Sequence, residues 1–327
     1  MTPRRATIVD IAEEIGISKS TVANVLNGTG RFSPETAERV HAAAERLGYA
    51  INRSARSLRS GRVGSFGLHL PAVARRLPFY AEFAFGAADG ADAAHSDLTL
   101  FTREVDPARR FAVDGAIVVD PAPDADIVVA LSRAGIPLVS VGAYRGIGEA
   151  EVSATLDARH DVLQREALTA LRRRGRNRFV LLSMRRDLGA AWAEQTEHTF
   201  RSWCAEAGVP SVVIDVSAAP ATQSATAVLA EVTRHGGDAV VCAGQGLAQL
   251  MRVALETSGV RIGEDLDLAS FAASPAEMLD GRLTVLDLAP GAYGERAAEL
   301  LARIVDGDRT ALGHHWFEGA AVRVGQP

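Results

Sequence analysis

Residues 7–28 read TIVDIAEEIGISKSTVANVLNG, and this stretch decides the fold of the N-terminal part of the chain. Thr7 followed by Asp10 is typical of a helix start, because a hydroxyl and a carboxylate three residues apart can cap the first turn. Gly16 can turn the chain in a left-handed conformation, and Ser18 is a second N-cap candidate. Two helices separated by about three residues have helix-turn-helix geometry.

A third helix is predicted after Ser33, which can cap it and is followed by proline at the first helical position. Three short helices can share one small core, and the second helix of such a unit fits the major groove of DNA. Its outward side chains, Lys19, Ser20 and Asn24, are of types that bind base edges. The alternative is an unrelated three-helix fragment with a solvated face.

The charge of the chain is unevenly distributed. The 327 residues carry 35 basic and 40 acidic side chains, a net charge of -5. Residues 1–62 hold ten basic and six acidic groups, a net +4, which leaves -9 on the remaining 265 residues. A basic head on an acidic body is expected of a nucleic-acid-binding domain joined to a second function.

Several classes of protein are excluded by simple signals. Cys204 and Cys242 are far apart, so we expect two buried thiols in a reducing cytoplasm rather than a disulfide or zinc site. The chain shows neither a signal peptide nor an apolar run of about 18 residues, so no membrane association is expected. Nucleotide-binding and nucleophile motifs are missing, and His314-His315 lacks a third ligand. We therefore expect no cofactor, no metal and no enzymatic activity.

From residue 63 onward, short apolar runs alternate with helical stretches. Strands are predicted over 63–70, 97–101, 115–119, 137–141, 178–182, 212–216, 238–241, 267–271 and 283–288. Helices are predicted over 79–94, 160–174, 191–207, 224–235, 247–258 and 293–305. The alternation predicts parallel sheets with right-handed crossovers. Nine strands exceed one comfortable core, so we expect two α/β lobes with a ligand in the cleft between them.

The segment 172–178, RRRGRNR, is the densest basic run. It follows a predicted helix and precedes a predicted strand. We interpret it as cations at a helix C-terminus that face solvent, in preference to a phosphate-binding patch.

The segment 7–64 resembles the DNA-binding head and hinge of the LacI/GalR family of transcriptional regulators. The quoted stretch and FSPETAERVHAAAERLGYAINRSARSLRSGRVGSFGL, at 32–68, carry the resemblance, which continues more weakly along nearly all of the chain. It implies an all-α helix-turn-helix head over 1–49, a hinge helix over 50–62 and a periplasmic-binding-protein-like body of two parallel-sheet lobes over 63–327. Lobe one would comprise about 63–158 and 289–316, and lobe two about 159–288 and 317–327.

The resemblance assigns DNA contacts residue by residue. It makes Lys19, Ser20 and Asn24 the readers of the major groove. Backbone phosphates would be contacted by Thr7, Ser18, Thr21, Asn27, Ser33 and Thr36. Leu58 matches the leucine that enters the minor groove at the centre of a palindromic operator, and Ala55 lies one turn before it. Ala23 stands where many members have serine. The resemblance also implies a homodimer, or a higher oligomer, on double-stranded operator DNA.

The effector site departs from the sugar-binding members of the family. Asp157 matches an acid that clamps hydroxyl groups, but Thr196 stands where an arginine is expected. Gly244-Gln245 replaces an Asn-Asp pair, and Ala272-Ala273 replaces two aspartates. Either the cleft binds a less polar small-molecule effector, with Phe79, Tyr80, Trp192 and Gln245 as candidate walls, or ligand binding has been lost.

These observations predict a dimeric transcriptional repressor with a small-molecule effector of unknown identity in the interlobe cleft. The alternative from another class is a cytoplasmic sugar-binding or sugar-processing α/β protein that does not bind DNA.

Overall fold

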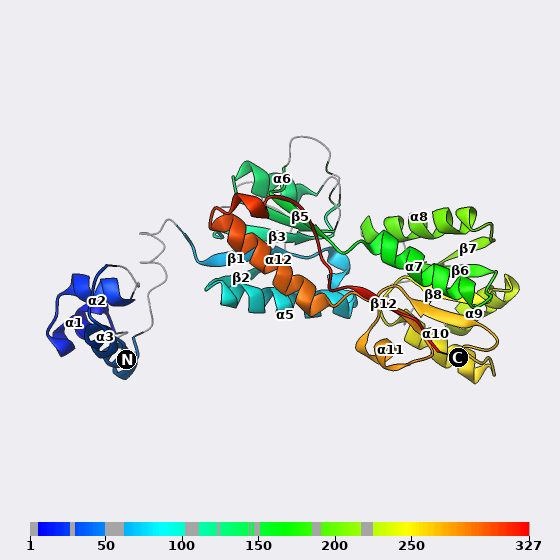
Figure 1. The fold of residues 1–327 in the computed structure, drawn as a ribbon, viewed down its shortest axis with the longest axis horizontal. Helices are drawn as coiled ribbons and strands as arrows, with labels where there is room; N and C mark the ends of the chain where they lie inside the picture. Colours follow the sequence, from blue (N-terminus) through cyan, green and yellow to red (C-terminus); the bar gives the residue numbers. More distant parts are fainter. Residues whose placement is uncertain are drawn as a thin grey trace. The chain divides into compact units, whose positions relative to one another are not determined.

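The computed structural model describes residues 6–26, 30–49, 62–101, 111–122, 125–142, 144, 146, 151–184, 191–216 and 225–326 (Figure 1). The chain divides into two compact units, Met1–Val63 and Gly64–Pro327. We call them the head and the body. Residues 50–61, which make up nearly all of the expected hinge, lie outside the described residues.

The described part of the head is all α-helical, as predicted. It consists of α1 (Ile8–Ile15), α2 (Lys19–Leu26) and α3 (Pro34–Arg46). Thr7 and Asp10 form both bonds of a capping box, and Gly16 ends α1 with a φ of 69°. Ser33 accepts a hydrogen bond from the Thr36 N–H at the start of α3. One small core joins the three helices and contains Ile11, Ala12, Val22, Val25, Val40, Ala43 and Ala44.

Lobe one of the body is built on a parallel sheet in the order β11-β5-β4-β3-β1-β2. Its strands are β1 (Ser65–His69), β2 (Asp97–Phe101), β3 (Gly115–Val119), β4 (Leu138–Val141), β5 (Ala154–Asp157) and β11 (Gly313–Trp316). Its helices are η1 (Ala72–Arg76), α5 (Pro78–Ala93), α6 (Asp126–Arg133), α12 (Pro290–Val305) and η4 (Arg309–Ala311). Helices α5 and α12 pack against one face of the sheet and α6 against the other (Figure 1).

Lobe two is built on a second sheet in the order β12-β10-β9-β8-β6-β7, in which only the β12–β10 pair is antiparallel. Its strands are β6 (Phe179–Met184), β7 (Ser211–Val216), β8 (Ala239–Cys242), β9 (Asp267–Ser270), β10 (Thr284–Asp287) and β12 (Ala321–Arg323). Its helices are α7 (His160–Arg173), α8 (Ala191–Glu206), α9 (Ala225–Arg234), α10 (Leu247–Thr257) and α11 (Pro275–Leu279). Helices α7 and α8 cover one face, and α9 and α10 the other.

The prediction of two α/β lobes is confirmed, and the nine predicted strands are present with ends shifted by at most two residues. Three strands, β5, β11 and β12, were not predicted. Each has only three or four residues, and β11 reads GHHW, with three of its four residues exposed. The edge strands β11 and β12 lack an apolar run, and β5, which lies inside its sheet, is too short to show one.

The chain passes between the lobes after β5, after β10 and after β11, and the first two crossings share one local structure. Asp157 accepts a hydrogen bond from the Arg159 N–H at 2.8 Å, and Asp287 accepts one from the Ala289 N–H at 2.9 Å. Arg159 and Ala289 are the N-cap residues of α7 and α12 and have left-handed φ values of 51° and 43°. Each crossing therefore ends a strand with an aspartate-capped turn that redirects the chain into a helix of the other lobe.

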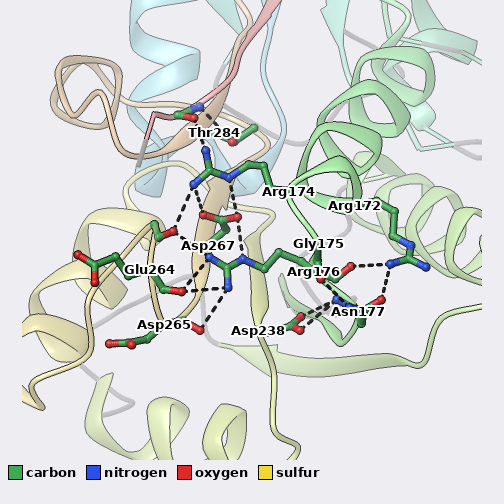
Figure 2. Close-up of polar contacts among 12 residues, drawn as sticks. Arg172, Arg174, Gly175, Arg176, Asn177, Asp238, Glu264, Asp265, Asp267 and Thr284 are labelled. Carbon is green, nitrogen blue, oxygen red and sulfur yellow. Dashed lines mark hydrogen bonds and ion pairs between the residues drawn. The ribbon is translucent and has the colours of Figure 1, made fainter.

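The basic run at 172–178 corrects one expectation. Arg174 and Arg176 do not face solvent, because both guanidinium groups bind the carboxylate of buried Asp267, at 2.8 and 2.9 Å (Figure 2). They also donate to backbone carbonyls of Gly263 and neighbouring residues. These two arginines tie the end of α7 to the loop before β9, whereas the other arginines of the run are exposed as predicted.

Candidate functional site

The outward face of α2 carries the three side chains expected to read bases. Lys19, Ser20 and Asn24 are all exposed, while Val22 and Val25 on the same helix are buried in the head core. The helical period thus separates a polar face from an apolar one within eight residues. This places a lysine, a hydroxyl and an amide on the exposed face of the helix.

Hydroxyl groups gather at the N-termini of the head helices. The Ser18 hydroxyl lies 2.7 Å from that of Ser20 and 2.8 Å from that of Thr21, and it also accepts the Thr21 N–H. At α3, the Ser33 and Thr36 hydroxyls are 2.8 Å apart. Helix N-termini present unpaired N–H groups and a partial positive charge, so such ends suit phosphate groups.

The structure describes only one of the other predicted DNA contacts. Thr7 is exposed at the start of α1, where its hydroxyl already binds the Asp10 carboxylate at 2.7 Å. Asn27, Ala55 and Leu58 lie outside the described residues.

Two cations of the head have structural partners. Arg46 on α3 forms an ion pair with Glu14 on α1 at 2.7 Å, and Arg39 donates to the Ile15 carbonyl at 2.9 Å. They hold α3 against α1. The positive charge of the head is therefore only partly available for a nucleic acid.

In the body, a cavity of about 60 Å³ lies between the lobes. We call it the cleft cavity. Its lining comprises Leu77, Phe79, Tyr80, Asp120, His160, Gln164, Trp192, Thr196, Ala243, Gly244, Gln245, Phe271, Ala272 and Leu288. Five of the six predicted effector residues are brought together here. The sixth, Asp157, is not in the lining, because its carboxylate caps the turn at the first crossing.

Direct hydrogen bonds join the lobes across this cavity. Trp192 of lobe two donates to the Tyr80 hydroxyl of lobe one at 3.1 Å, and Tyr80 donates to the Asp120 carboxylate at 2.9 Å. The Phe79 N–H of lobe one donates to the side-chain oxygen of Gln245, whose amide nitrogen donates to the Ala273 carbonyl at 3.2 Å. The cleft is narrow because side chains of one lobe bind those of the other.

Burial shifts the pKa values of the groups in the cleft. Loss of water raises the pKa of Asp120 to about 6, against the opposing effect of the Tyr80 hydrogen bond, and the nearby Asp157 charge adds to the rise. Burial lowers the pKa of His160, so its ring is neutral at neutral pH, and raises the pKa of Tyr80 well above its ordinary value. Asp120 also has a left-handed φ of 47°, a strained conformation that is common at functional sites.

Sequence reasoning missed Asp120, His160 and Gln164. Asp120 directly follows β3, at the carboxyl end of a strand, which is where ligands bind in such sheets. His160 and Gln164 are four residues apart at the start of α7 and so share a helix face. The predicted strand 115–119 and helix 160–174 already gave these placements, so the position of Asp120 after the strand and the spacing of His160 and Gln164 were usable signals.

Two family models match the chain. Residues 7–52 match the bacterial regulatory proteins of the lacI family, and residues 168–326 match a periplasmic binding protein-like domain. The chain belongs to the LacI family. Its relatives are named as transcriptional regulators, which places this family member among regulators rather than enzymes.

The relatives differ in how much of this LacI-family chain they match. The HTH-type transcriptional regulator CelR of Thermobifida fusca is 29% identical over 324 residues, 94% of each chain. The maltose regulon regulatory protein MalI of Escherichia coli K12 is 39% identical over 136 residues, which span 38% of this chain and 39% of MalI.

Solved structures share the fold. The lac repressor dimer bound to operator and the anti-inducer ONPF has a TM-score of 0.79 at 17% identity and covers 99% of this chain and 100% of that one. A CelR–cellobiose complex has a TM-score of 0.64 at 23% identity and covers 98% and 99%. Among the described residues, no helix has both the length and the apolar character needed to cross a membrane.

Proposed function

We propose that this LacI-family regulator is a repressor that binds a palindromic operator through its head and responds to a small-molecule effector in the cleft cavity. The observation that carries the proposal is the head itself. It matches the lacI family model over 7–52, and α2 presents Lys19, Ser20 and Asn24 on its exposed face. Because the regulator acts on DNA, its proposed location is the cytoplasm.

The hydroxyl groups at the helix N-termini support the role of phosphate contacts. Ser18 with Thr21, and Ser33 with Thr36, form two pairs of hydroxyls beside helix N–H groups. In the proposed complex these pairs fix the position of α2 on the duplex, and the α2 side chains supply base recognition. The resemblance adds Asn27 to the phosphate contacts and Leu58, with Ala55, to the minor groove.

A homodimer is the proposed assembly, since a palindromic operator mirrors a two-fold axis. Exposed apolar side chains on the body support it. Phe85 on α5, Val253 on α10 and Leu279 on α11 are 73%, 51% and 88% exposed. Figure 1 shows these three helices along the same, lower side of the body. Substituting Leu279 with Glu should shift the sedimentation coefficient toward the monomer if this side is the interface.

The cleft cavity is the proposed effector site. A solved structure named as a transcriptional regulator CelR–cellobiose complex shares the fold of this chain, and five of the six residues expected at the effector site line the cavity. The effector would act by changing the angle between the lobes. This change would alter the distance between the hinges of the two protomers, so that Leu58 enters the minor groove or leaves it.

The experiment that tests DNA binding is a fluorescence anisotropy titration of the full chain with duplex DNA at several salt concentrations. Phosphate contacts predict a linear fall of log K with log salt, with a slope of about -0.9 for each contact. The competing class, an α/β protein that binds sugars without DNA, predicts no salt-dependent binding of a duplex.

A further inference from the structure

Two buried polar atoms that face the cleft cavity have no hydrogen-bond partner. They are Nε2 of His160 and Oε1 of Gln164, and both residues line the cavity. Gln164 is 5% exposed. The residues are one turn apart on α7, so they present neighbouring polar atoms from a single helix face. A buried polar atom without a partner is unfavourable and indicates a missing water or ligand.

The orientation of Gln164 defines what must bind it. Its amide nitrogen donates to the Thr196 hydroxyl at 2.9 Å, which fixes the side chain and leaves the oxygen as a free acceptor. The missing partner of Gln164 is therefore a donor, a hydroxyl or an N–H group. His160 is neutral because burial lowers its pKa, so its Nε2 can accept or donate according to the tautomer.

The opposite wall of the cavity also offers an acceptor. The Asp120 carboxylate of lobe one lies there and receives one described side-chain hydrogen bond, from Tyr80. None of the described lining residues is a lysine or an arginine. An anionic ligand would bring negative charge beside Asp120, whereas a neutral ligand with several donors matches both walls.

The small size of the cavity indicates that binding of a larger ligand must break hydrogen bonds between the lobes. A volume of about 60 Å³ is far below the roughly 300–1,000 Å³ of pockets that hold small-molecule ligands. A larger ligand must separate Trp192 from Tyr80 and Phe79 from Gln245, and it would take over the freed groups. Phe79, Trp192 and Phe271 then provide apolar walls for its less polar faces.

We propose that His160 and Gln164 of lobe two, facing Asp120 of lobe one, form the polar anchor of the effector site, and that the effector is an uncharged compound rich in hydroxyl or N–H donors. This inference rests on the proposed role of the cleft cavity. It assigns residues of α7 that the resemblance did not, and it predicts that acidic and phosphorylated effectors bind more weakly than neutral ones.

The test uses the full chain and pairs of probes, each a neutral compound and its anionic derivative. Binding of cellobiose, glucose and myo-inositol is measured by thermal shift and calorimetry, each beside its acidic or phosphorylated counterpart: cellobionate, glucuronate and inositol phosphate. We expect a neutral member to bind and its anionic counterpart to bind at least about tenfold more weakly. Gln164→Leu should weaken binding of the neutral probe by about tenfold, because a donor group of the probe loses the Gln164 oxygen as its acceptor. Glu166→Gln, at an exposed position on the same helix, should leave binding unchanged.

Controls separate failure of this inference from failure of the proposed function. Gln164→Leu and His160→Phe should unfold cooperatively in urea like the parent, which shows that the body of each variant folds. Both should also bind duplex DNA with the salt dependence of the parent. Equal or tighter binding of the anionic probes would overturn the proposal. Unchanged binding of the neutral probes by both variants would also overturn it, as would the failure of every neutral probe to bind the parent. In each case, DNA binding by the parent would still support the proposed regulatory function.

Discussion

The indole N–H of Trp192 donates to the hydroxyl of Tyr80 at 3.1 Å, and these residues belong to different lobes of the body. The Tyr80 hydroxyl in turn donates a hydrogen bond to the Asp120 carboxylate at 2.9 Å, so one chain of hydrogen bonds runs from α8 to the end of β3. In the closed cleft these bonds occupy space that a larger effector needs. The lobes are thus coupled by the same side chains that line the proposed site.

A double-mutant cycle measures this coupling. Tyr80→Phe leaves the Trp192 N–H without its acceptor, so it should lower the free energy of unfolding by about 1–3 kcal/mol. Combined with Trp192→Phe, it should show a coupling energy of at least about 0.5 kcal/mol in urea denaturation. Trp203 donates to Thr169 within lobe two. A cycle of Tyr80→Phe with Trp203→Phe should therefore show none, and equal coupling in both cycles would contradict the direct contact.

Asp120→Asn should change stability in a pH-dependent way. The pKa of Asp120 is raised to about 6 in the folded chain, so its charged form opposes folding. Stability is fully present below the ordinary aspartate pKa of about 4 and is lost as the pH rises through 6. Asparagine keeps an acceptor for Tyr80 without the charge. The variant should exceed the parent by about 1–3 kcal/mol at pH 8 and match it near pH 4; a constant difference across this range would refute the assignment.

Asp267→Asn should destabilise lobe two strongly. Asp267 is 2% exposed and holds both Arg174 and Arg176. Removing its charge leaves two half-buried guanidinium groups without a counterion, at a cost of about 3–5 kcal/mol. Urea denaturation checks this result. The matched control is Glu299→Gln in the exposed pair with Arg296, which should cost less than about 1 kcal/mol. Similar losses from both variants would argue against the buried cluster.

Two glycines of α12 give a matched test of the packing in lobe one. A Cβ at Gly294 would lie 2.0 Å from the Phe83 carbonyl oxygen on α5, whereas a Cβ at Gly291 would have no neighbour within 4 Å. Gly294→Ala should therefore lower the thermal midpoint, at a cost of about 1–3 kcal/mol or more. Gly291→Ala should be neutral or slightly stabilising, since alanine favours a helix. The account of this helix pair fails if the two variants unfold at the same temperature.

The division into a helical head and an α/β body could be predicted from the sequence because each element carries a strong local signal. Caps at Thr7 and Ser33 and the buried runs of β3 and β8 are such signals. The contact of Arg174 and Arg176 with Asp267 could not be predicted, since Asp267 is about 90 residues away and reads as an ordinary acid at the start of a strand.

The effector site was predictable in part. The resemblance pointed to Phe79, Tyr80, Trp192, Thr196 and Gln245, and the fold brings them to one cavity. Asp157 matches the family pattern but is used as a turn cap. Asp120 and Gln164 carry no motif, and only the fold, which places the end of β3 and the first turns of α7 on one cavity, gives them a common role.

The central claim, sequence-specific DNA binding by the head, is tested most directly by selecting bound duplexes from a random pool with the full chain. The account predicts enrichment of an inverted repeat. Asn24→Ala should relax the preference at one position in each half-site, by about 1–3 kcal/mol, while Arg46→Ala, whose side chain pairs with Glu14, should leave the selected sequence unchanged. Recovery of a pool without any enriched sequence would contradict the account.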